Sequence, residues 1–407
     1  MNILYDAGIY LMVFGIRIAS LFTRKAALWV KGRRNIFQYL RDTVGIYDRI
    51  IWFHAASLGE FEQGRTVMEQ IRVRYPEYKI LLTFFSPSGY EVAKNYRGAD
   101  YIFYLPADTK LNAKRFLKIV KPEKAVFIKY EFWANYLRYL RRYGAEIYVI
   151  SALFRRDSTF FKWYGGRYRK LLKYFDWLFV QDENSKYLLS GIGINNVSVS
   201  GDTRFDRVAE IKNKDFDLHV VEKFGGGKKI FIAGSTWKED EEIILEKIQN
   251  HSDIKLIIVP HEVNSEHISW ICSKIEGRVL KYTDIYPDIP SENYDVLIVD
   301  VMGLLSKLYR YGDFAYIGGG FGAGIHNILE AAVYGLPVAF GPNHSKFKEA
   351  GGLLCKGGAT CITDSTELYQ WLELLKNDSN LYEEVSGICA DYVAGNTGAT
   401  KTIIEKI

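Results

Sequence analysis

Short apolar runs alternate with stretches of helical periodicity along the whole chain. The runs are rich in Val, Ile and Phe, and each leads into a polar or glycine turn. In the first half they cover residues 50–57, 79–86, 101–108, 124–131, 146–154, 177–182 and 197–202, and in the second half 229–236, 255–261, 278–284, 296–301, 314–321, 337–343 and 359–364. Such strands, each followed by a helix, are typical of parallel sheets buried on both faces. The pattern predicts an α/β protein with two doubly wound, Rossmann-like domains.

A charged stretch that ends in three consecutive glycines separates the two halves. The chain has 407 residues, which is long for a single core. We expect an N-terminal segment at 1–35, a first domain at 36–206, a linker at 207–228, a second domain at 229–385 and a C-terminal helix at 386–407 that can return to the first domain. Ligands are expected in a central cleft, at the carboxyl ends of both sets of strands.

The N-terminal segment is apolar from residue 7 to residue 22 except for Arg17, and a basic stretch follows it. Its uninterrupted apolar part is about ten residues long, shorter than the roughly 20 that cross a bilayer. No small-residue cleavage site follows, so a signal peptide is not indicated. A marginal anchor and an interfacial amphipathic helix are the two interpretations that we weigh, against an ordinary packed helix.

The composition limits which partners and cofactors are expected. With 48% hydrophobic and 25% charged residues, the composition is that of a globular protein. The net charge of +5 is too modest to indicate binding to nucleic acid. The four cysteines show no paired spacing and are typical of reduced thiols in the cytosol. The histidines show no metal-ligand spacing, and Asp215 and Asp217 lie in a charged connector. We therefore expect neither a metal nor another cofactor.

The strongest local signal is a glycine loop after the apolar run that ends at Ile317. Five glycines fall within residues 318–324, among them Gly320 and Gly322. Such a loop lets backbone N–H groups approach a phosphate at the start of the next helix. Asn327 and Glu330 stand three apart in that helix, a spacing suited to ribose hydroxyls. A dinucleotide fingerprint fits poorly, because no acidic residue ends a strand about 20 positions later.

Two further strand ends of the second half carry weaker signals. Ser235 and Thr236 precede a helix with an acidic first turn, so they are either helix caps or donors to a phosphate. Met302 and Gly303 follow another strand, where backbone groups can meet a nucleobase.

Three charged residues stand at strand ends of the first half: Glu60, Glu131 and Arg204. Because parallel strands end at one edge of a sheet, we expect all three to face the same crevice. A helix start near Glu60 favours the ionised carboxylate and suits a general base. A helix-capping acid explains Glu60 equally well from the local sequence.

Six segments together resemble a known family. These are "FHAASLGEFEQ", "IKYEFWAN", "GDTRFD", "GSTWKEDEE", "VDVMGLL" and "GIHNILEAAVYGLPVAFGPN". In order and spacing they are similar to the Kdo transferases of lipopolysaccharide synthesis, and the likeness extends to at least residue 350. The resemblance implies a two-domain GT-B fold and an inverting, metal-independent transfer of Kdo from CMP-Kdo to a lipid A precursor (lipid IVA). The resemblance also implies that the protein acts at the cytoplasmic face of the bacterial inner membrane.

The resemblance assigns roles to individual positions. Glu60 becomes the proton acceptor, and Glu131 and Arg204 stabilise the transition state. The CMP pocket would be formed by Pro260, His261, Met302, Gly303, Asn327, Ile328, Leu329 and Glu330.

The chain departs from the family pattern at five positions. It has Arg204 where the family usually has Lys, and Arg keeps the charge but not the compact ammonium. It also has Lys129 in place of Glu, Trp237 in place of His, His261 in place of Arg and Leu304 in place of an acidic residue. These changes bear on the donor contacts more than on the reaction class. The alternatives are another GT-B nucleotide-sugar transferase or epimerase, and a non-catalytic membrane-associated protein that binds a nucleotide sugar.

A basic and aromatic segment at 153–175 is a candidate surface for the membrane and the acceptor. Its cationic residues include Arg155, Arg156, Lys162, Arg167, Arg169 and Lys170. Interfacial Lys and Arg each contribute about 1 kcal/mol near anionic lipid. A solvated basic helix is the alternative.

Overall fold

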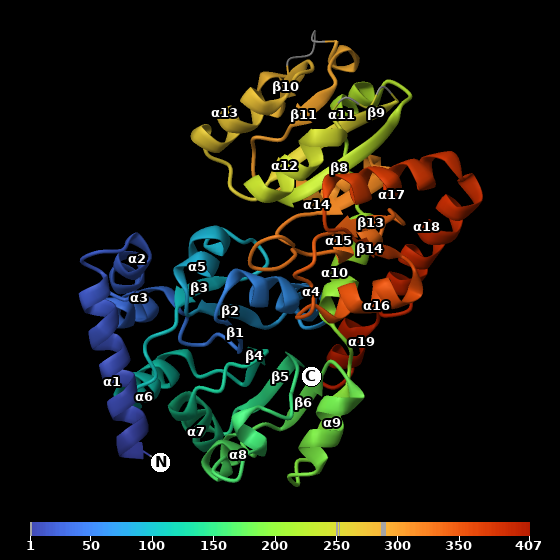
Figure 1. Ribbon diagram of the computed structural model, residues 1–407. Helices are drawn as coiled ribbons and strands as arrows, with labels where there is room; N and C mark the ends of the chain where they lie inside the picture. The colour runs from blue at the N-terminus through green and yellow to red at the C-terminus, as the bar shows by residue number, and fades with distance from the viewer. Residues whose placement is uncertain (1, 250, 252, 286–289) are drawn as a thin grey trace. The chain divides into compact units, whose positions relative to one another are not determined.

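The computed structural model describes residues 2–249, 251, 253–285 and 290–407. The chain forms two compact units, an N-terminal unit of Met1–Arg207 with Thr397–Ile407 and a C-terminal unit of Val208–Asn396. Each unit is built on its own parallel sheet of seven strands (Figure 1).

All fourteen predicted strands are present. In the N-terminal unit they are β1 (Ile50–Ala55), β2 (Lys79–Phe84), β3 (Tyr101–Tyr104), β4 (Lys124–Ile128), β5 (Glu146–Ala152), β6 (Trp177–Val180) and β7 (Val197–Val199). In the C-terminal unit they are β8 (Lys229–Thr236), β9 (Ile254–Pro260), β10 (Val279–Lys281), β11 (Val296–Ile298), β12 (Phe314–Ile317), β13 (Val338–Phe340) and β14 (Ala359–Cys361). The strand orders are β3-β2-β1-β4-β5-β6-β7 and β10-β11-β9-β8-β12-β13-β14.

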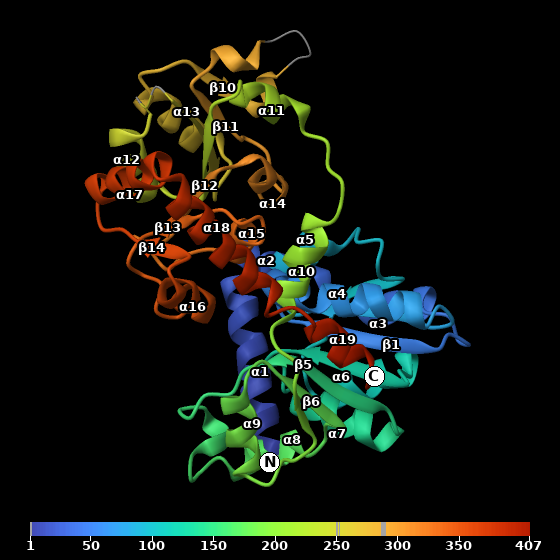
Figure 2. The ribbon, with the colours of Figure 1, turned by 90° about the vertical axis from the view of Figure 1, so that its right-hand side faces the viewer.

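Helices precede, connect and follow the strands of the N-terminal unit. They are α1 (Asn2–Ala19), α2 (Arg24–Gly32), α3 (Ile36–Thr43), α4 (Leu58–Arg74), α5 (Pro87–Ala93), α6 (Lys110–Val120), α7 (Ala134–Tyr143), η1 (Thr159–Phe161), α8 (Gly166–Leu172), α9 (Glu183–Ser190), α10 (Thr203–Lys212) and α19 (Ala399–Ile404). The last turns of α10 belong to the C-terminal unit. The last helix, α19, packs beside α4, although the two are far apart in sequence (Figure 2).

Strand β1 shows why helices cover both faces of this sheet. Its six residues are all buried, and their side chains alternate between the two faces. Ile50 and Trp52 pack into a core with α3, α6 and α7. Ile51 and Phe53 pack into a second core with α4, α5 and α19. A strand buried on both faces needs a continuous apolar sequence, and this is what the chain supplies.

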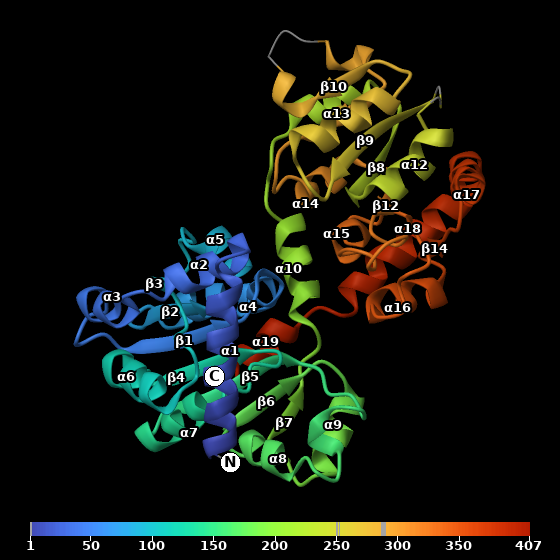
Figure 3. The same cartoon turned by 60° about the vertical axis from the view of Figure 1, so that its left-hand side comes forward.

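The C-terminal unit repeats this plan. Its helices are α11 (His219–Gly225), α12 (Lys238–Lys247), α13 (Ser265–Lys274), α14 (Leu305–Leu308), α15 (Leu329–Ala332), α16 (Lys348–Lys356), α17 (Ser365–Asn377) and α18 (Ser379–Ala394). Helices α12, α13 and α17 bury one face of the sheet, and α12 lies beside α17 (Figure 3). The stretch expected as a linker, 207–228, holds the end of α10 and all of α11.

Helix α1 is tied to the N-terminal unit along one side. Asp6 accepts a hydrogen bond from the side-chain amide of Asn135 at 2.8 Å and pairs with Lys110 at 3.0 Å. The other side is exposed and apolar, with Leu4, Tyr10, Leu11, Phe14 and Ile18. None of the helices that the structure describes is at once long enough and apolar enough to cross a membrane.

Candidate functional site

Glu60 lies in the first turn of α4, directly after β1. Its carboxylate accepts a hydrogen bond from the backbone N–H of Ala56, in the loop between the two elements. The residue therefore meets one expectation for a capping acid, because it satisfies a donor at the helix start. Its side chain is nevertheless partly shielded from water.

The surroundings of Glu60 change its acidity. Burial and the negative charge of Glu131 raise the pKa of Glu60 to about 7, while the N–H of Ala56 and the charge of Lys129 act in the opposite direction. A carboxyl group that ionises near neutral pH can accept a proton from a hydroxyl group, which an ordinary Glu does poorly. The capping and the general-base interpretations of Glu60 are thus compatible.

Glu131 follows β4 and is held by two aromatic side chains. The Trp133 indole N–H donates to its Oε2 atom at 2.6 Å, and the Nε2 atom of His54 lies 3.3 Å from the same oxygen. The Nδ1 atom of His54 lies 2.8 Å from the hydroxyl oxygen of Thr83, which in turn accepts from Trp52. The Trp133 indole N–H also lies 3.1 Å from Nε2 of His54, so Glu131, Trp133 and His54 form one polar cluster.

The local sequence assigns no role to His54 or Thr83. Both are fully buried polar residues on strands that are otherwise apolar. A polar residue within an apolar strand is the sequence signal that points to both positions. Buried polar groups need partners and often hold a functional side chain in place. Their partnership across β1 and β2 required the register of the sheet.

Arg204 lies at the start of α10, after β7. Its Nε and Nη2 atoms donate to Oδ2 of Asp202 at 2.9 Å and 2.7 Å. The guanidinium is therefore part of an ion pair within its own segment.

A cavity of about 460 Å³ lies beside Glu131. Its walls are mostly aromatic and come from α1, from the β4–α7 loop and from the segment around η1 and α8: Tyr5, Ile9, Tyr130, Phe132, Trp133, Thr159, Phe160 and Tyr168. Glu131 supplies the carboxylate of this lining. The cavity suits a ligand with both hydroxyl groups and an apolar part.

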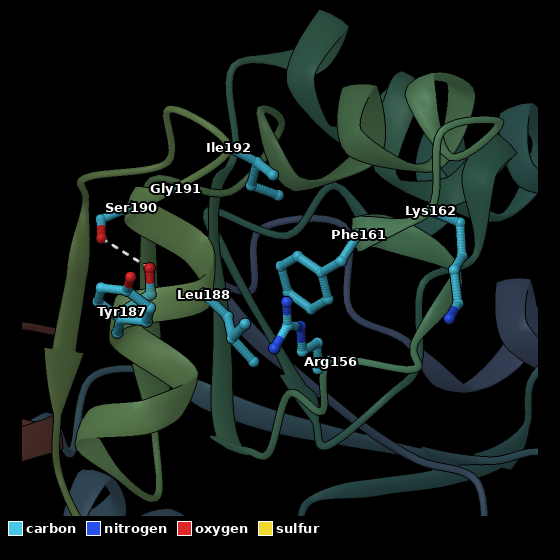
Figure 4. Close-up of a pocket in the computed structure, with 8 residues that line it drawn as sticks. All are labelled: Arg156, Phe161, Lys162, Tyr187, Leu188, Ser190, Gly191 and Ile192. Carbon is cyan, nitrogen blue, oxygen red and sulfur yellow. Dashed lines mark hydrogen bonds between the residues drawn. The ribbon is translucent and has the colours of Figure 1, made fainter.

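The basic segment at 153–175 is exposed in part. Trp163, within this segment, is 92% exposed. Arg169 differs from its neighbours, since its guanidinium donates to the carbonyl oxygens of Phe160 and Lys162 at 3.0 Å and holds the turn. Arg156 and Lys162 line a groove of about 550 Å³ opposite Tyr187 and Leu188 of α9 (Figure 4).

In the C-terminal unit the glycine loop packs against neighbouring backbone. A Cβ at Gly320 would lie 2.5 Å from the backbone nitrogen of Gly341, whereas Gly322 has open surroundings. The N–H of Gly319 donates to Asp240 at 2.8 Å, so part of the loop is held by the first turn of α12. The loop glycines allow close packing of the backbone, in addition to any role in binding a ligand.

The expected ribose pair is in contact. The amide of Asn327 donates to Oε1 of Glu330 at 2.9 Å. Asn327 precedes α15, which is only four residues long, and its side-chain oxygen accepts from the N–H of Leu329. Ile328 and Leu329 are buried behind them.

The two hydroxyl residues after β8 have different surroundings. Thr236 is buried, and its hydroxyl donates to Glu241 at 2.7 Å, so this group is engaged inside the unit. Ser235 is a non-glycine residue with a positive φ of 54°. Glu241 also contacts His267 at 2.7 Å.

Three rings stack near the end of β9. His261 lies between Trp237 and His326, with ring centroids 4.8 Å and 4.2 Å away. Trp237 also donates to Nε2 of His326 at 3.2 Å. Burial, helped by His261, lowers the pKa of His326 to about 4, so this ring is neutral at physiological pH. Of the three rings, His261 directly follows Pro260, the last residue of β9.

The remaining expected donor residues lie after β11. Met302 is 74% exposed, and Gly303 has a φ of 86°, which only glycine adopts freely. Within the described ranges, no group of three or more His, Cys, Asp or Glu side chains is placed to hold a metal ion.

Comparisons with known proteins find similarity to Kdo transferases. Residues 29–207 match the family model described as 3-deoxy-D-manno-octulosonic-acid transferase (Kdo transferase). A 3-deoxy-D-manno-octulosonic acid transferase from Rickettsia bellii is 28% identical over 92% of this chain and 89% of that protein. The transferase of the same name from Aquifex aeolicus is 27% identical over 78% of this chain and 85% of that protein.

Solved structures show the same fold at low identity. UDP-GlcNAc 2-epimerase from Neisseria meningitidis has a TM-score of 0.62 and 15% identity, with 88% of this chain and 98% of that chain covered. MurG from Acinetobacter baumannii has a TM-score of 0.52 and 11% identity, with 88% and 98% covered. The predicted GT-B fold with two parallel sheets is confirmed.

Proposed function

We propose that this chain, which is similar to Kdo transferases, is a glycosyltransferase that moves Kdo from CMP-Kdo to a lipid A precursor, lipid IVA. The proposal includes inversion at the anomeric carbon and a mechanism without a metal ion. It rests on the family relationship for the sugar and on the residues around Glu60 for the chemistry.

The observation that carries the mechanism is the environment of Glu60. Its pKa of about 7 means that much of it is ionised at neutral pH and that it is basic enough to take a proton. We assign Glu60 as the general base. It removes the proton of the acceptor hydroxyl while that oxygen attacks C2 of Kdo, and the bond from C2 to the phosphate oxygen breaks. CMP leaves, and a single displacement inverts the configuration.

Glu131 and Arg204 support this step in the proposal. Glu131 is oriented by Trp133 and His54, so it is a rigid hydrogen-bond acceptor for the acceptor sugar. Arg204 supplies positive charge that can offset the charge on the leaving phosphate. Its ion pair with Asp202 fixes the direction of its guanidinium.

The C-terminal unit is assigned the donor. The glycine loop and the Asn327–Glu330 pair are proposed to hold the phosphate and the ribose of CMP. The stacked rings of Trp237, His261 and His326 provide a flat surface next to the end of β9. Because His326 stays neutral, this surface does not repel or bind the donor through charge on that ring.

We further propose that the protein works on the cytoplasmic face of the bacterial inner membrane. The exposed side of α1 carries apolar residues that include Leu11, Phe14 and Ile18. Trp163 and Tyr164, in the basic segment, are also exposed. A helix that is apolar on one side and flanked by basic residues lies in the membrane interface. Lipid substrates would then reach the cavity beside Glu131, to which α1 contributes Tyr5 and Ile9.

Mass spectrometry of the lipid product tests the proposal. Purified protein is incubated with CMP-Kdo and lipid IVA, and Glu60→Gln is compared with Glu62→Gln, which lies two residues further along α4 and is half-exposed. We expect a mass increase of one or more Kdo units for wild type and Glu62→Gln, and a rate lower by about 10²–10⁴-fold for Glu60→Gln. Equal rates for the two variants would remove Glu60 as the base.

Two further readouts test the finer parts of the mechanism. The anomeric configuration of the product, determined by NMR, is expected to be opposite to that of CMP-Kdo, and a retained configuration would exclude the single displacement. The rate is expected to be unchanged after treatment with EDTA. A loss that added Mg²⁺ restores would contradict the metal-free mechanism.

A further inference from the structure

A basic cavity lies between α1, α2, α3 and α6, and the proposed reaction does not use it. Its volume is about 760 Å³. The four helices and the turn after α2 contribute six cationic side chains to its lining: Arg17, Lys31, Arg33, Arg34, Arg41 and Arg115. None of its described lining residues is acidic.

Carboxylates of the protein neutralise little of the positive charge of this cavity, although Lys31 interacts electrostatically with Glu91. Within the part of the chain that the structure describes, none of the six makes an ion pair with a carboxylate, whereas nearby Lys110 pairs with Asp6 at 3.0 Å. Unpaired cations that converge on a concave surface concentrate positive potential. Exposed basic residues scattered on a convex surface would not do so.

Arg33 fixes part of this charge in place. Its Nε and Nη2 atoms donate to the carbonyl oxygens of Leu105 and Phe85, both at 2.8 Å, and its guanidinium lies 3.8 Å from the ring centre of Trp29. Burial lowers the pKa of Arg33 to about 9, which leaves it protonated at neutral pH. The wall of the cavity therefore carries a rigid positive charge.

The rest of the lining is amphipathic. Val13, Val30 and Phe37 supply apolar surface, and the first turn of α3 points its N-terminal end to the cavity. The buried indole N–H of Trp29 has no acceptor among the described residues. A matching ligand has anionic oxygens on one side and an apolar part on the other.

We propose that this cavity binds the phosphodiester headgroup of an anionic membrane phospholipid. The lining matches such a headgroup in charge, and the cavity adjoins the exposed apolar side of α1. Arg17 is on α1, one residue before the exposed Ile18 and one turn after the exposed Phe14. A headgroup held here keeps its acyl chains next to the apolar side of α1. The inference builds on the proposed membrane contact of α1 and adds a specific site to it.

Titration calorimetry with a soluble lipid tests this site. The full chain is titrated with monomeric dihexanoyl phosphatidylglycerol, without CMP-Kdo or lipid IVA, so the result does not depend on transferase activity. The test variant is Arg34→Gln with Arg41→Gln. The control is Lys118→Gln with Lys401→Gln, which removes the same charge from exposed positions of the same unit.

We expect saturable one-site binding for wild type and the control, and binding about 30-fold weaker for the cavity variant. This corresponds to ~1 kcal/mol for each basic residue. If the double variant fails to fold, Arg34→Gln alone is expected to weaken binding about fivefold. Retained binding in the cavity variant, or equal weakening in the control, would overturn the site.

Two further ligands separate the sources of the phosphate. Dihexanoyl phosphatidylcholine, which is zwitterionic, is expected to bind at least tenfold more weakly. Equal binding would show that the net negative charge of the headgroup is not recognised and would overturn the proposal. Inorganic phosphate that binds as tightly as the lipid would show a site for free phosphate and would also overturn it.

Discussion

The hydroxyl of Tyr5 donates to Oδ2 of Asp108 at 2.6 Å, across 103 positions of the sequence. Asp108 is buried and also accepts the backbone N–H groups of Asn135 and Tyr136, both at 3.0 Å. These two residues belong to the first turn of α7, which follows Glu131 and Trp133. The first helix of the chain is thereby bonded to the segment that carries the candidate site.

Removing this hydroxyl should destabilise the N-terminal unit. Tyr5→Phe leaves the buried Asp108 carboxyl with one donor fewer, and we expect a loss of about 1–2 kcal/mol in the free energy of unfolding. Urea denaturation measures the loss. Tyr10→Phe, on the exposed side of the same helix, should change it by less than about 0.5 kcal/mol. Equal effects of the two variants would mean that the bond contributes nothing specific.

The rate of Kdo transfer should depend on pH through Glu60. In the proposed mechanism the base is ionised, and the pKa of Glu60 is about 7, so kcat/KM should fall as the pH drops through 7. At one pH unit below the pKa only about a tenth of Glu60 is ionised, and the rate should fall by about tenfold. Initial rates between about pH 4 and pH 8.5 locate the midpoint. A midpoint near 4.5, the value of an unperturbed Glu, would contradict this environment.

Two neighbours of Glu60 should move this midpoint in opposite directions. Glu131 raises the pKa of Glu60 and Lys129 lowers it. Glu131→Gln should therefore shift the acid limb to lower pH, and Lys129→Gln should shift it to higher pH. The position of the limb is the readout, because it separates electrostatics from any loss of maximal rate. Shifts in the same direction would show that Glu60 is not the titrating group.

The glycine loop offers a matched pair of substitutions. Gly320→Ala places a Cβ 2.5 Å from the backbone nitrogen of Gly341, and backbone cannot move aside cheaply. We expect it to destabilise the C-terminal unit by about 1–3 kcal/mol and to weaken CMP binding.

Gly322→Ala is the control for this substitution. Its nearest neighbour would be the carbonyl oxygen of Gly319 at 3.8 Å, an ordinary contact. Thermal unfolding and calorimetric titration with CMP measure both effects. Similar behaviour of the two variants would show that loop packing does not shape the donor site.

The sequence alone was sufficient for the architecture. Fourteen apolar runs predicted fourteen strands, and each strand was found, because a strand buried on both faces needs continuous apolar residues and this signal is local. Glu60, Glu131 and Arg204 were recognised as strand-end residues for the same reason. The family resemblance was readable too, since it lies in short segments of fixed order.

The surroundings of each group were decided by tertiary structure. No local pattern shows that Thr236 donates to Glu241, that Arg204 pairs with Asp202 or that His54 supports Glu131. A pKa depends on burial and on charges that the fold brings together. Whether Glu60 is suited to act as a base, and does not only cap a helix, could therefore be judged only once the positions of its neighbours were known. The basic cavity is a further case, because four helices must converge before scattered Arg and Lys residues become one site.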